Sequence, residues 1–324
     1  MTSAILMAGY SNKREVKRYS RIVAEHYGDN YIEIGYRPLR EFPFINSEGK
    51  EEKKAIILFT LERLLESDLI DEIIIVGHRM LLEEKLRSFI HSMDKPCRII
   101  NQNSRIPGNI VEEFNIQAKD VKYNSFAGNA IKAYALTKAY QEKKHALFIA
   151  SDSPMTTKEF IEDFIHKTQK FDKSFALFVP AVFTGVNEDK LGRKPLLLRN
   201  DTDTIVSDIK DAYGRQGFRL SSLLVANPYL FDINTMNTAY HLRKFLSPRV
   251  QFQLYRITRG LGYANVYSKY FIRKDLSVLE CEEITSTYFK GQVKIIPVVG
   301  ENSTYDYDGT EKEFEGLNEM LLKK

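Results

Sequence analysis

The chain has 324 residues, 43% hydrophobic and 28% charged, which is ordinary for a globular enzyme and enough to bury a substantial core. The net charge is only +4 and the Lys and Arg residues are dispersed, so nucleic acid as an obligate partner gains little support. Two isolated cysteines without metal-type spacing favour a reducing compartment. The start MTSAILMAGY lacks a basic signal region, and no window reaches 18 apolar residues, so we expect a cytoplasmic protein without a transmembrane segment.

Strands and helices alternate through the first half of the chain, which is typical of a parallel sheet covered by helices. After the segment Arg37–Leu39 we expect a loop that carries Pro43 and Gly49. The predicted strands are Ser3–Ala8, Tyr31–Ile34, Glu72–Val76, Arg98–Ile100 and a central strand that begins at His145. The predicted helices are Lys54–Ser67, one that follows Gly77, and Ala130–Glu142, which Gly128 and Asn129 open.

The central strand carries the sequence LFIASDSPMTT, Leu147–Thr157. Its apolar run is long enough for a buried strand, and Pro154 prevents a central strand from continuing. Thr156 and Thr157 then offer N-cap chemistry for a helix over Lys158–Gln169. Asp152 is therefore expected just past the carboxyl end of a central strand, where open α/β sheets bind their ligands. The alternative is an Asp that caps a turn.

The second half of the chain completes the sheet and adds helices. The predicted elements are the strands Ser174–Phe183, Lys194–Arg199, Phe218–Asn227 and Val293–Val299, a mostly helical stretch Thr235–Lys290, and a closing helix Thr310–Leu322. The simplest partition is one domain over residues 1–324 with a helical insertion at about 235–290. The amphipathic helices around Tyr255–Arg273 suit packing with a polar outer face; the alternatives are an acceptor lid, a homodimer surface or a membrane-surface contact.

Three stretches, in this order, resemble the MobA-like nucleotidyltransferases, which share the GT-A (nucleotide-diphospho-sugar transferase) fold. They are ILMAG (Ile5–Gly9) with the later YRPL, then FIASDSPMTTKEFIEDFI, and finally DYDGTEKEF (Asp306–Phe314). The resemblance implies a Rossmann-like α/β fold with a mostly parallel central sheet, helices on both faces and the insertion before the last strand. It also implies a nucleotide-binding half, about residues 1–150, and a metal and acceptor half, about residues 151–324.

The same resemblance implies an enzyme that depends on Mg²⁺ (or Mn²⁺). It would transfer NMP from an NTP to a phosphorylated or anionic small-molecule acceptor and release pyrophosphate. Asp152 and Asp308, with Asp306 as a further candidate, are the expected metal ligands, since magnesium needs only one or two protein carboxylates beside phosphates. Arg37 stands where the family has a nucleotide-contacting Lys, so Asp152, Asp308 and Arg37 are the expected catalytic residues. A solvated turn for Asp308 and a surface position for Arg37 are the alternatives.

The nucleotide itself is expected at the end of the first strand. A glycine there lets backbone amides approach phosphates, and cations can help to neutralise them. The residues in question are Ala8, Gly9, Lys13, Arg14 and Lys17. Gly128 and Asn129 are further candidates, for contact with base or ribose; an ordinary turn glycine at position 9 and a plain N-cap at Asn129 are the alternatives. Lys194 is another candidate cation, with a solvent-facing position as its alternative.

Two other functions stay open at this stage. A glycosyltransferase that uses a sugar nucleotide would share the fold, and a non-catalytic nucleotide-binding or regulatory protein would share the binding site. The expected partners are an NTP and a small-molecule acceptor, with no nucleic acid and with a homodimer left open.

Overall fold

The centre of the protein is a mixed β-sheet, seen here in a computed structural model that describes residues 2–9, 36–117, 125–189, 191, 193–203, 207–236, 255–307 and 311–323. Within these residues nine strands form the sheet in the order β5-β4-β1-β6-β10-β7-β9-β8, and β11 pairs with β7. The strands are β1 (Thr2–Ala8), β4 (Ile70–Gly77), β5 (Cys97–Asn101), β6 (Ala146–Ala150), β7 (Leu177–Phe183), β8 (Leu196–Leu198), β9 (Gln216–Leu220), β10 (Leu223–Ala226) and β11 (Val293–Val299).

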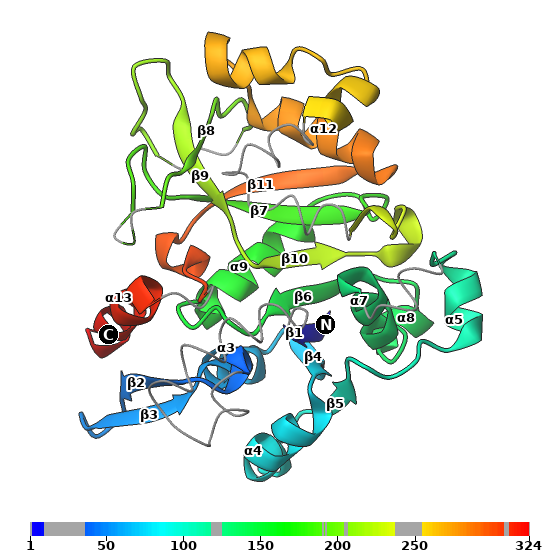
Figure 1. Cartoon of the computed structure of the whole chain (residues 1–324), viewed down its shortest axis with the longest axis vertical. Coiled ribbons are helices and arrows are strands. Elements are labelled where there is room, and N and C mark those ends of the chain that lie inside the picture. Colours follow the sequence, from blue (N-terminus) through cyan, green and yellow to red (C-terminus); the bar gives the residue numbers. More distant parts are fainter. Residues whose placement is uncertain are drawn as a thin grey trace.

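Helices surround this sheet, and a separate hairpin lies beside it (Figure 1). The helical segments are η1 (Arg37–Leu39), α3 (Ile56–Glu66), α4 (Arg79–His91), α5 (Gly108–Glu113), α7 (Phe126–Tyr134), α8 (Lys138–Gln141), α9 (Lys158–Thr168), η2 (Pro228–Leu230), η3 (Ser268–Arg273), α12 (Val278–Phe289), η4 (Glu301–Thr304) and α13 (Glu311–Leu322). The hairpin consists of β2 (Glu41–Ile45) and β3 (Glu51–Ala55). None of the described helices combines the length and apolar composition that crossing a bilayer requires.

The sheet has a parallel part and a mixed part. Strand β1 runs parallel to both of its neighbours, with Ala4 opposite Ile73 of β4 and Leu147 of β6, and β5 continues this arrangement beyond β4. Strand β10 then enters antiparallel between β6 and β7. The expected α/β fold with helices on both faces is confirmed, while the expected mostly parallel sheet holds for β5-β4-β1-β6 and gives way to a mixed sheet beyond β6.

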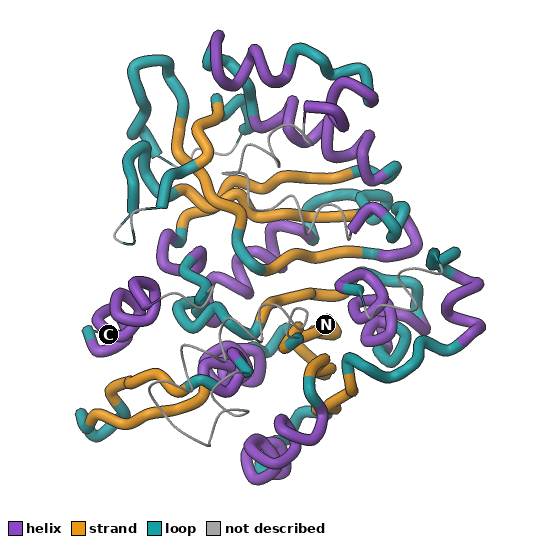
Figure 2. The backbone as a smooth tube through the Cα atoms, in the orientation of Figure 1, coloured by secondary structure: helices purple, strands orange, loops and turns teal. Residues whose placement is uncertain are grey.

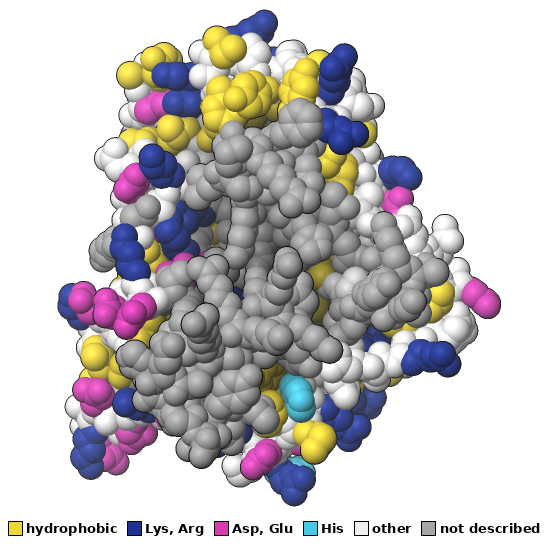
Figure 3. Space-filling model, in the orientation of Figure 1, with side chains coloured by type: hydrophobic (Ala, Val, Ile, Leu, Met, Phe, Trp, Pro, Cys, Tyr) yellow, Lys and Arg dark blue, Asp and Glu magenta, His cyan; other side chains and the backbone are white. Residues whose placement is uncertain are grey.

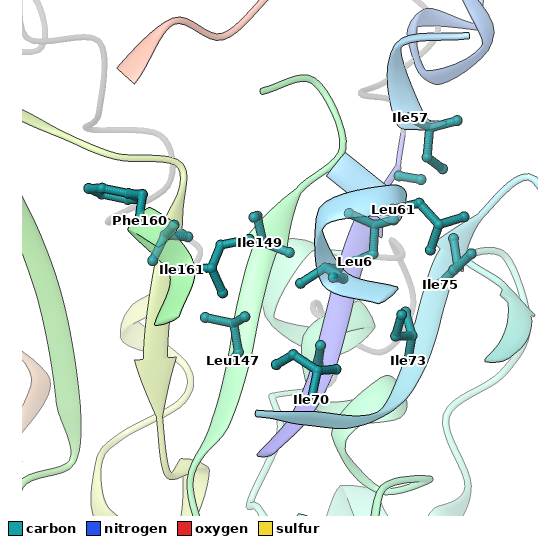
Figure 4. Packing of buried hydrophobic residues seen from close by; sticks show 14 of the residues in the cluster. Leu6, Ile57, Leu61, Ile70, Ile73, Ile75, Leu147, Ile149, Phe160 and Ile161 are labelled. Carbon is teal, nitrogen blue, oxygen red and sulfur yellow. The ribbon is translucent and has the colours of Figure 1, made fainter. Parts of the chain in front are cut away.

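Apolar side chains alternate between the two faces of the parallel part and bury against different helices. On one face, Leu6 of β1 and Leu147 of β6 lie against Leu61 of α3 and Ile161 of α9 (Figure 4). On the other face, Ile5 and its neighbours contact helices α5, α7 and α8. Because each fully buried Leu or Ile contributes about 1.5–3 kcal/mol, these two layers hold the strand ends in fixed positions.

Most predicted elements lie within a few residues of those observed. The strands β1, β4, β5, β6, β7, β8 and β11 and the helices α3, α4, α9 and α13 are confirmed. Helix α9 begins where predicted because the Thr157 side chain accepts a hydrogen bond from the Phe160 N–H at 3.2 Å. Helical segments at 255–260, 268–273 and 278–289 agree with the predicted insertion in the part that the structure describes.

Two predicted elements are split. The predicted helix Ala130–Glu142 instead starts at Phe126, because Ser125 caps it, and ends at Tyr134; Thr137 then caps the separate short helix α8. The predicted strand Phe218–Asn227 is two strands, because the chain bends at Ser221 and Ser222. Strand β9 pairs with the last residues of β7, and β10 pairs with the first residues of β7 and with β6.

The loop predicted to carry Pro43 and Gly49 is wrong at Pro43, which lies in β2, whereas Gly49 lies in the turn of the β2–β3 hairpin. The hairpin stands apart from the central sheet, with α13 next to it (Figure 2). Its Phe42 is fully buried among residues of α3 and α13, so tertiary packing rather than local alternation holds the hairpin in place. The predicted strand Tyr31–Ile34 lies outside the described residues.

Candidate functional site

The carboxyl ends of four neighbouring strands form one edge of the sheet. Hydrogen bonds hold these ends together: the Ser151 N–H donates to the Met7 carbonyl at 3.1 Å, and the Gln102 N–H donates to the Gly77 carbonyl at 2.9 Å. Residues that follow β6, β1, β4 and β5 therefore lie in a row, in the order of the strands. This is the edge at which open α/β sheets bind ligands.

Tyr36 joins two of these strand ends. Its buried hydroxyl donates to the Ala8 carbonyl and accepts a hydrogen bond from the His78 N–H at 2.9 Å. Gly77 makes room for this hydroxyl, because a Cβ atom at that position would lie only 2.2 Å from the Tyr36 oxygen. Since Arg37 is the next residue, fixing Tyr36 also fixes where the Arg37 side chain begins.

Asp152 lies in the turn that follows β6, as predicted from the sequence. Arg37 Nη1 is 3.8 Å from Asp152 Oδ2, and the two side chains are 20% and 22% exposed. The same Nη1 atom donates to the Tyr307 carbonyl at 3.3 Å, and the Tyr307 N–H donates to the Asp152 carbonyl at 2.8 Å. Three segments far apart in the sequence thus meet at one point, which is partly open to solvent.

Tyr307 is the residue that ties the late acidic segment to this point. Its side chain is fully buried, and its ring packs edge-on against Phe42 at 5.2 Å between centroids. Arg40 donates to the Tyr307 hydroxyl and stacks over the Phe314 ring at 3.9 Å. The hairpin and α13 therefore hold the segment on which Asp306 and Asp308 lie; Asp308 itself is outside the described residues.

Asp306 is held by a guanidinium group. Arg193 Nη1 is 3.0 Å from Asp306 Oδ1, and Arg193 Nε is 2.9 Å from the almost fully buried carboxylate of Asp189. Arg219 lies 3.4 Å from the same carboxylate, and burial together with the nearby Arg193 charge lowers the pKa of Arg219. The sequence prediction considered Lys194, whose side chain is 71% exposed. It missed Arg193, Asp189 and Arg219. The sequence GRKP does not indicate whether Arg193 or Lys194 forms buried ion pairs.

The first-strand candidates lie at the same edge. The Ala8 carbonyl is the atom that Tyr36 binds, and a Cβ atom on Gly9 would lie 3.0 Å from the Gln102 side-chain oxygen. Gln102 is almost fully buried and was not predicted from the sequence. Glycine at position 9 thus allows the strand end to pass close to Gln102. Lys13, Arg14 and Lys17 lie outside the described residues.

Lys132 explains why Gln102 is fixed. Its ammonium group donates to the carbonyls of Asn101 and Gln102, both at 2.8 Å, and of Ser104 at 3.1 Å. Burial lowers the pKa of Lys132 to about 8. The side chain therefore secures the end of β5 and the turn after it, next to Gly9.

Gly128 and Asn129 lie inside the first turn of α7 rather than before it. The Gly128 N–H donates to the Ser125 hydroxyl and the Asn129 N–H to the Ser125 carbonyl, both at 3.0 Å. Ser125 is therefore the N-cap, and the alternative of a plain N-cap at Asn129 is wrong. Both backbone amides are engaged within the helix, so a nucleotide contact from this helix would use the Asn129 side chain, which stays a prediction.

The donor set at Asp152 is compatible with magnesium. Among the described residues, no three His, Cys, Asp or Glu side chains gather closely enough to hold a metal ion. Magnesium in phosphate-transfer sites, however, keeps several waters and takes one or two carboxylates plus phosphate oxygens. A partly exposed carboxylate at the strand end meets that need, whereas the Asp306 carboxylate is already paired with Arg193.

No protein-family model matches the chain, and no curated protein sequence matches it at a significant level. Solved structures do match. A hypothetical transferase from Thermus thermophilus is 16% identical, with a TM-score of 0.53 over 97% of this chain and 99% of that chain.

Two further solved structures match the chain over a similar length with lower TM-scores. A 4-diphosphocytidyl-2C-methyl-D-erythritol synthase from Anaerococcus prevotii is 14% identical, with a TM-score of 0.47 over 98% of this chain and 95% of that chain. A CMP:2-keto-3-deoxy-manno-octonic acid synthetase in complex with CTP is 9% identical, with a TM-score of 0.49 over 98% and 97%. At these identities the likeness shows the fold alone. The chain therefore shares the α/β fold of the hypothetical transferase from Thermus thermophilus.

Proposed function

We propose that the protein is a magnesium-dependent nucleotidyltransferase that joins an NTP to a phosphorylated or anionic small-molecule acceptor. The observation that carries the proposal is the meeting of Asp152, Arg37 and the segment that ends at Tyr307 at the carboxyl edge of the sheet. A carboxylate and a cation at that edge, on a transferase fold, suit a triphosphate and its metal ion.

The proposed reaction needs positioning and charge neutralisation more than covalent help from the protein. An oxygen of the anionic acceptor forms a bond to the α-phosphorus, the bond from that phosphorus to the bridging oxygen breaks, and pyrophosphate leaves with the bonding electrons. Because the attacking oxygen is already deprotonated, the step requires no general base.

In this proposal Asp152 and Asp308 hold the metal ion, and Arg37 binds the triphosphate. Bound Mg²⁺ offsets negative charge on the α-phosphate and the departing pyrophosphate. Asp306 is assigned to the ion pair with Arg193, which is the interaction it makes in the structure. Ala8, Gly9, Lys13, Arg14 and Lys17 are proposed to cradle the phosphates, with the Asn129 side chain near base or ribose.

The test is pyrophosphate release from each of the four NTPs, with a panel of phosphorylated and carboxylated acceptors, with and without Mg²⁺. Asp152→Ala should reduce the rate by at least about 100-fold, since it removes charge stabilisation of the transition state. The matched control is Asp163→Ala, which removes an exposed carboxylate on α9 whose ion-pair partner among the described residues is Lys167, and it should leave the rate unchanged.

Two outcomes would overturn the proposal in favour of a different function. Binding of a nucleoside diphosphate sugar in preference to every NTP would indicate a glycosyltransferase. Binding of NTP without turnover on any acceptor, unaffected by Asp152→Ala, would indicate a regulatory nucleotide-binding protein.

A further inference from the structure

Acidic residues are distributed unevenly along the chain. Residues 233–274 contain eight Lys and Arg residues and neither Asp nor Glu, which leaves 39 basic against 43 acidic residues in the remainder. The positive net charge of the chain thus resides in this one stretch. Residues 255–274, which the structure describes, are called the basic segment below and include η3.

The basic segment lies on the surface as a thin layer. None of the residues of η3 is buried. Tyr267 and Phe271 are 44% and 46% exposed, and Ile272 is 73% exposed. The rings of Tyr267 and Phe271 are 4.4 Å apart, and the Tyr255 ring lies 6.5 Å from that of Tyr267, so these apolar groups form one outward-facing cluster.

Three exposed arginines lie in the same segment as this cluster. Arg256, Arg259 and Arg273 are exposed and form no ion pair with a described residue. Lys269 is paired with Glu280. Figure 3 shows hydrophobic and Lys or Arg side chains side by side at the end of the molecule where the helices of residues 255–289 lie in Figure 1.

Three of the acidic groups near the segment are already engaged. Glu280 binds Lys269 and caps α12 through the Ser277 N–H, and Glu283 accepts a hydrogen bond from the Tyr263 hydroxyl. Asp201 accepts from the Leu279 N–H at the start of α12. The three exposed arginines therefore present their charge to solvent.

We propose that the basic segment docks the protein onto an anionic lipid bilayer. Aromatic and aliphatic side chains flanked by Arg and Lys are the composition of interfacial membrane-binding helices, in which the apolar groups enter the headgroup boundary and the cations contact anionic headgroups. A second copy of the chain fits less well, since a symmetric contact would bring the same unpaired arginines together. Nucleic acid would use the cations and stack on the rings but would leave Ile272 without a role.

The experiment is sedimentation of the full chain with vesicles of phosphatidylcholine alone or of an equal mixture with phosphatidylglycerol. Binding is expected only to the mixed vesicles and should weaken as salt rises. The triple variant Arg256→Gln, Arg259→Gln and Arg273→Gln should bind about 100-fold more weakly, since each cation contributes roughly fivefold near an anionic surface.

Matched controls distinguish the role of the basic segment from the effects of net charge and of exposed hydrophobic side chains elsewhere. In the first control, Gln replaces three exposed arginines in the first half of the chain: Arg87, Arg98 and Arg105. This variant has the same net charge as the triple variant and should bind vesicles as the wild type does. Phe271→Ser with Ile272→Ser should weaken binding at every salt concentration, whereas Met80→Ser, at a 76% exposed position on α4, should not.

Three results would overturn the proposal. One is equal binding of the wild type and of the triple variant to mixed vesicles. Another is no vesicle binding together with RNA or DNA binding that the triple variant loses. The third is concentration-dependent dimerisation that Phe271→Ser with Ile272→Ser abolishes, which would make the segment a homodimer surface.

Discussion

The contact between Gly77 and the Tyr36 hydroxyl gives a quantitative prediction. In Gly77→Ala the new Cβ atom would lie 2.2 Å from the Tyr36 oxygen, 2.6 Å from the Ala8 carbonyl oxygen and 2.7 Å from a methyl group of Leu82. The Tyr36 hydroxyl must move, so its two hydrogen bonds are lost at a cost of about 1–3 kcal/mol. Overpacking against the backbone adds about 1–3 kcal/mol.

Tyr36→Phe loses the same hydrogen bonds without the clash, so we expect it to lower the free energy of unfolding by about 1–3 kcal/mol. In the double variant that loss is counted once. The sum of the two single effects should therefore exceed the effect of the double variant by about 1–3 kcal/mol.

The assay is urea unfolding followed by circular dichroism, since the chain has no tryptophan for fluorescence. Gly108→Ala is the matched control, because a Cβ atom there meets nothing within 4 Å and the residue lies in helix α5, so it should not destabilise the fold. Strictly additive effects of Gly77→Ala and Tyr36→Phe would show that the hydroxyl does not occupy the space beside Gly77, and the account of how Arg37 is positioned would fail with it.

Three further predictions concern buried groups. Lys132→Met should destabilise the fold by about 2–3 kcal/mol because three carbonyls lose their donor. Burial lowers the pKa of Lys132 from 10.5 to about 8, so on raising the pH the folded state loses this proton before the unfolded state does. The difference in free energy of unfolding between wild type and variant should therefore grow as pH rises from 8 to 10.5. Urea unfolding across that range measures the difference, and a decrease would contradict the lowered pKa. Arg193→Gln should lower the free energy of unfolding by about 3 kcal/mol, because it leaves the Asp189 carboxylate, which is only 1% exposed, without this partner. Lys194→Gln, at an exposed position, should change thermal stability very little. Equal effects of the two variants would refute the assigned ion pairs of Arg193. Burial raises the pKa of both Cys97 and Cys281 to about 12, so neither thiol should react quickly with iodoacetamide at pH 8 until urea unfolds the chain, as mass spectrometry would detect.

The parts of the fold that hydrophobic pattern determines were predictable. Strands such as β4 and β6 are short apolar runs that bury both faces, and α9 combines a Thr cap with an apolar stripe. The position of Asp152 followed from them, because a strand that ends in Asp-Ser-Pro fixes where the turn lies.

The elements that were missed depend on contacts between distant residues. Nothing in the sequence EEKKA of β3 alternates, and β2 carries a proline, so the packing of Phe42 against α3 and α13 stabilises the hairpin rather than its local pattern. In the same way, the pairing of Arg193 with Asp306 and the hydrogen bond of Tyr307 to Asp152 join residues more than 100 positions apart. Local propensity carries no information about such pairs.

The insertion of β10 beside β6 bears on how the chain reaches its native state. Strand β6 pairs on one side with β1 and on the other with β10, so Leu147 faces both Ala4 and Val225. These pairings require long loops to close, and the entropy cost of closing them comes before the strand contacts form. We therefore expect a high contact order and slow refolding. A polypeptide cut after Ala150 would leave β6 as an open edge, and the two fragments should regain structure only when mixed.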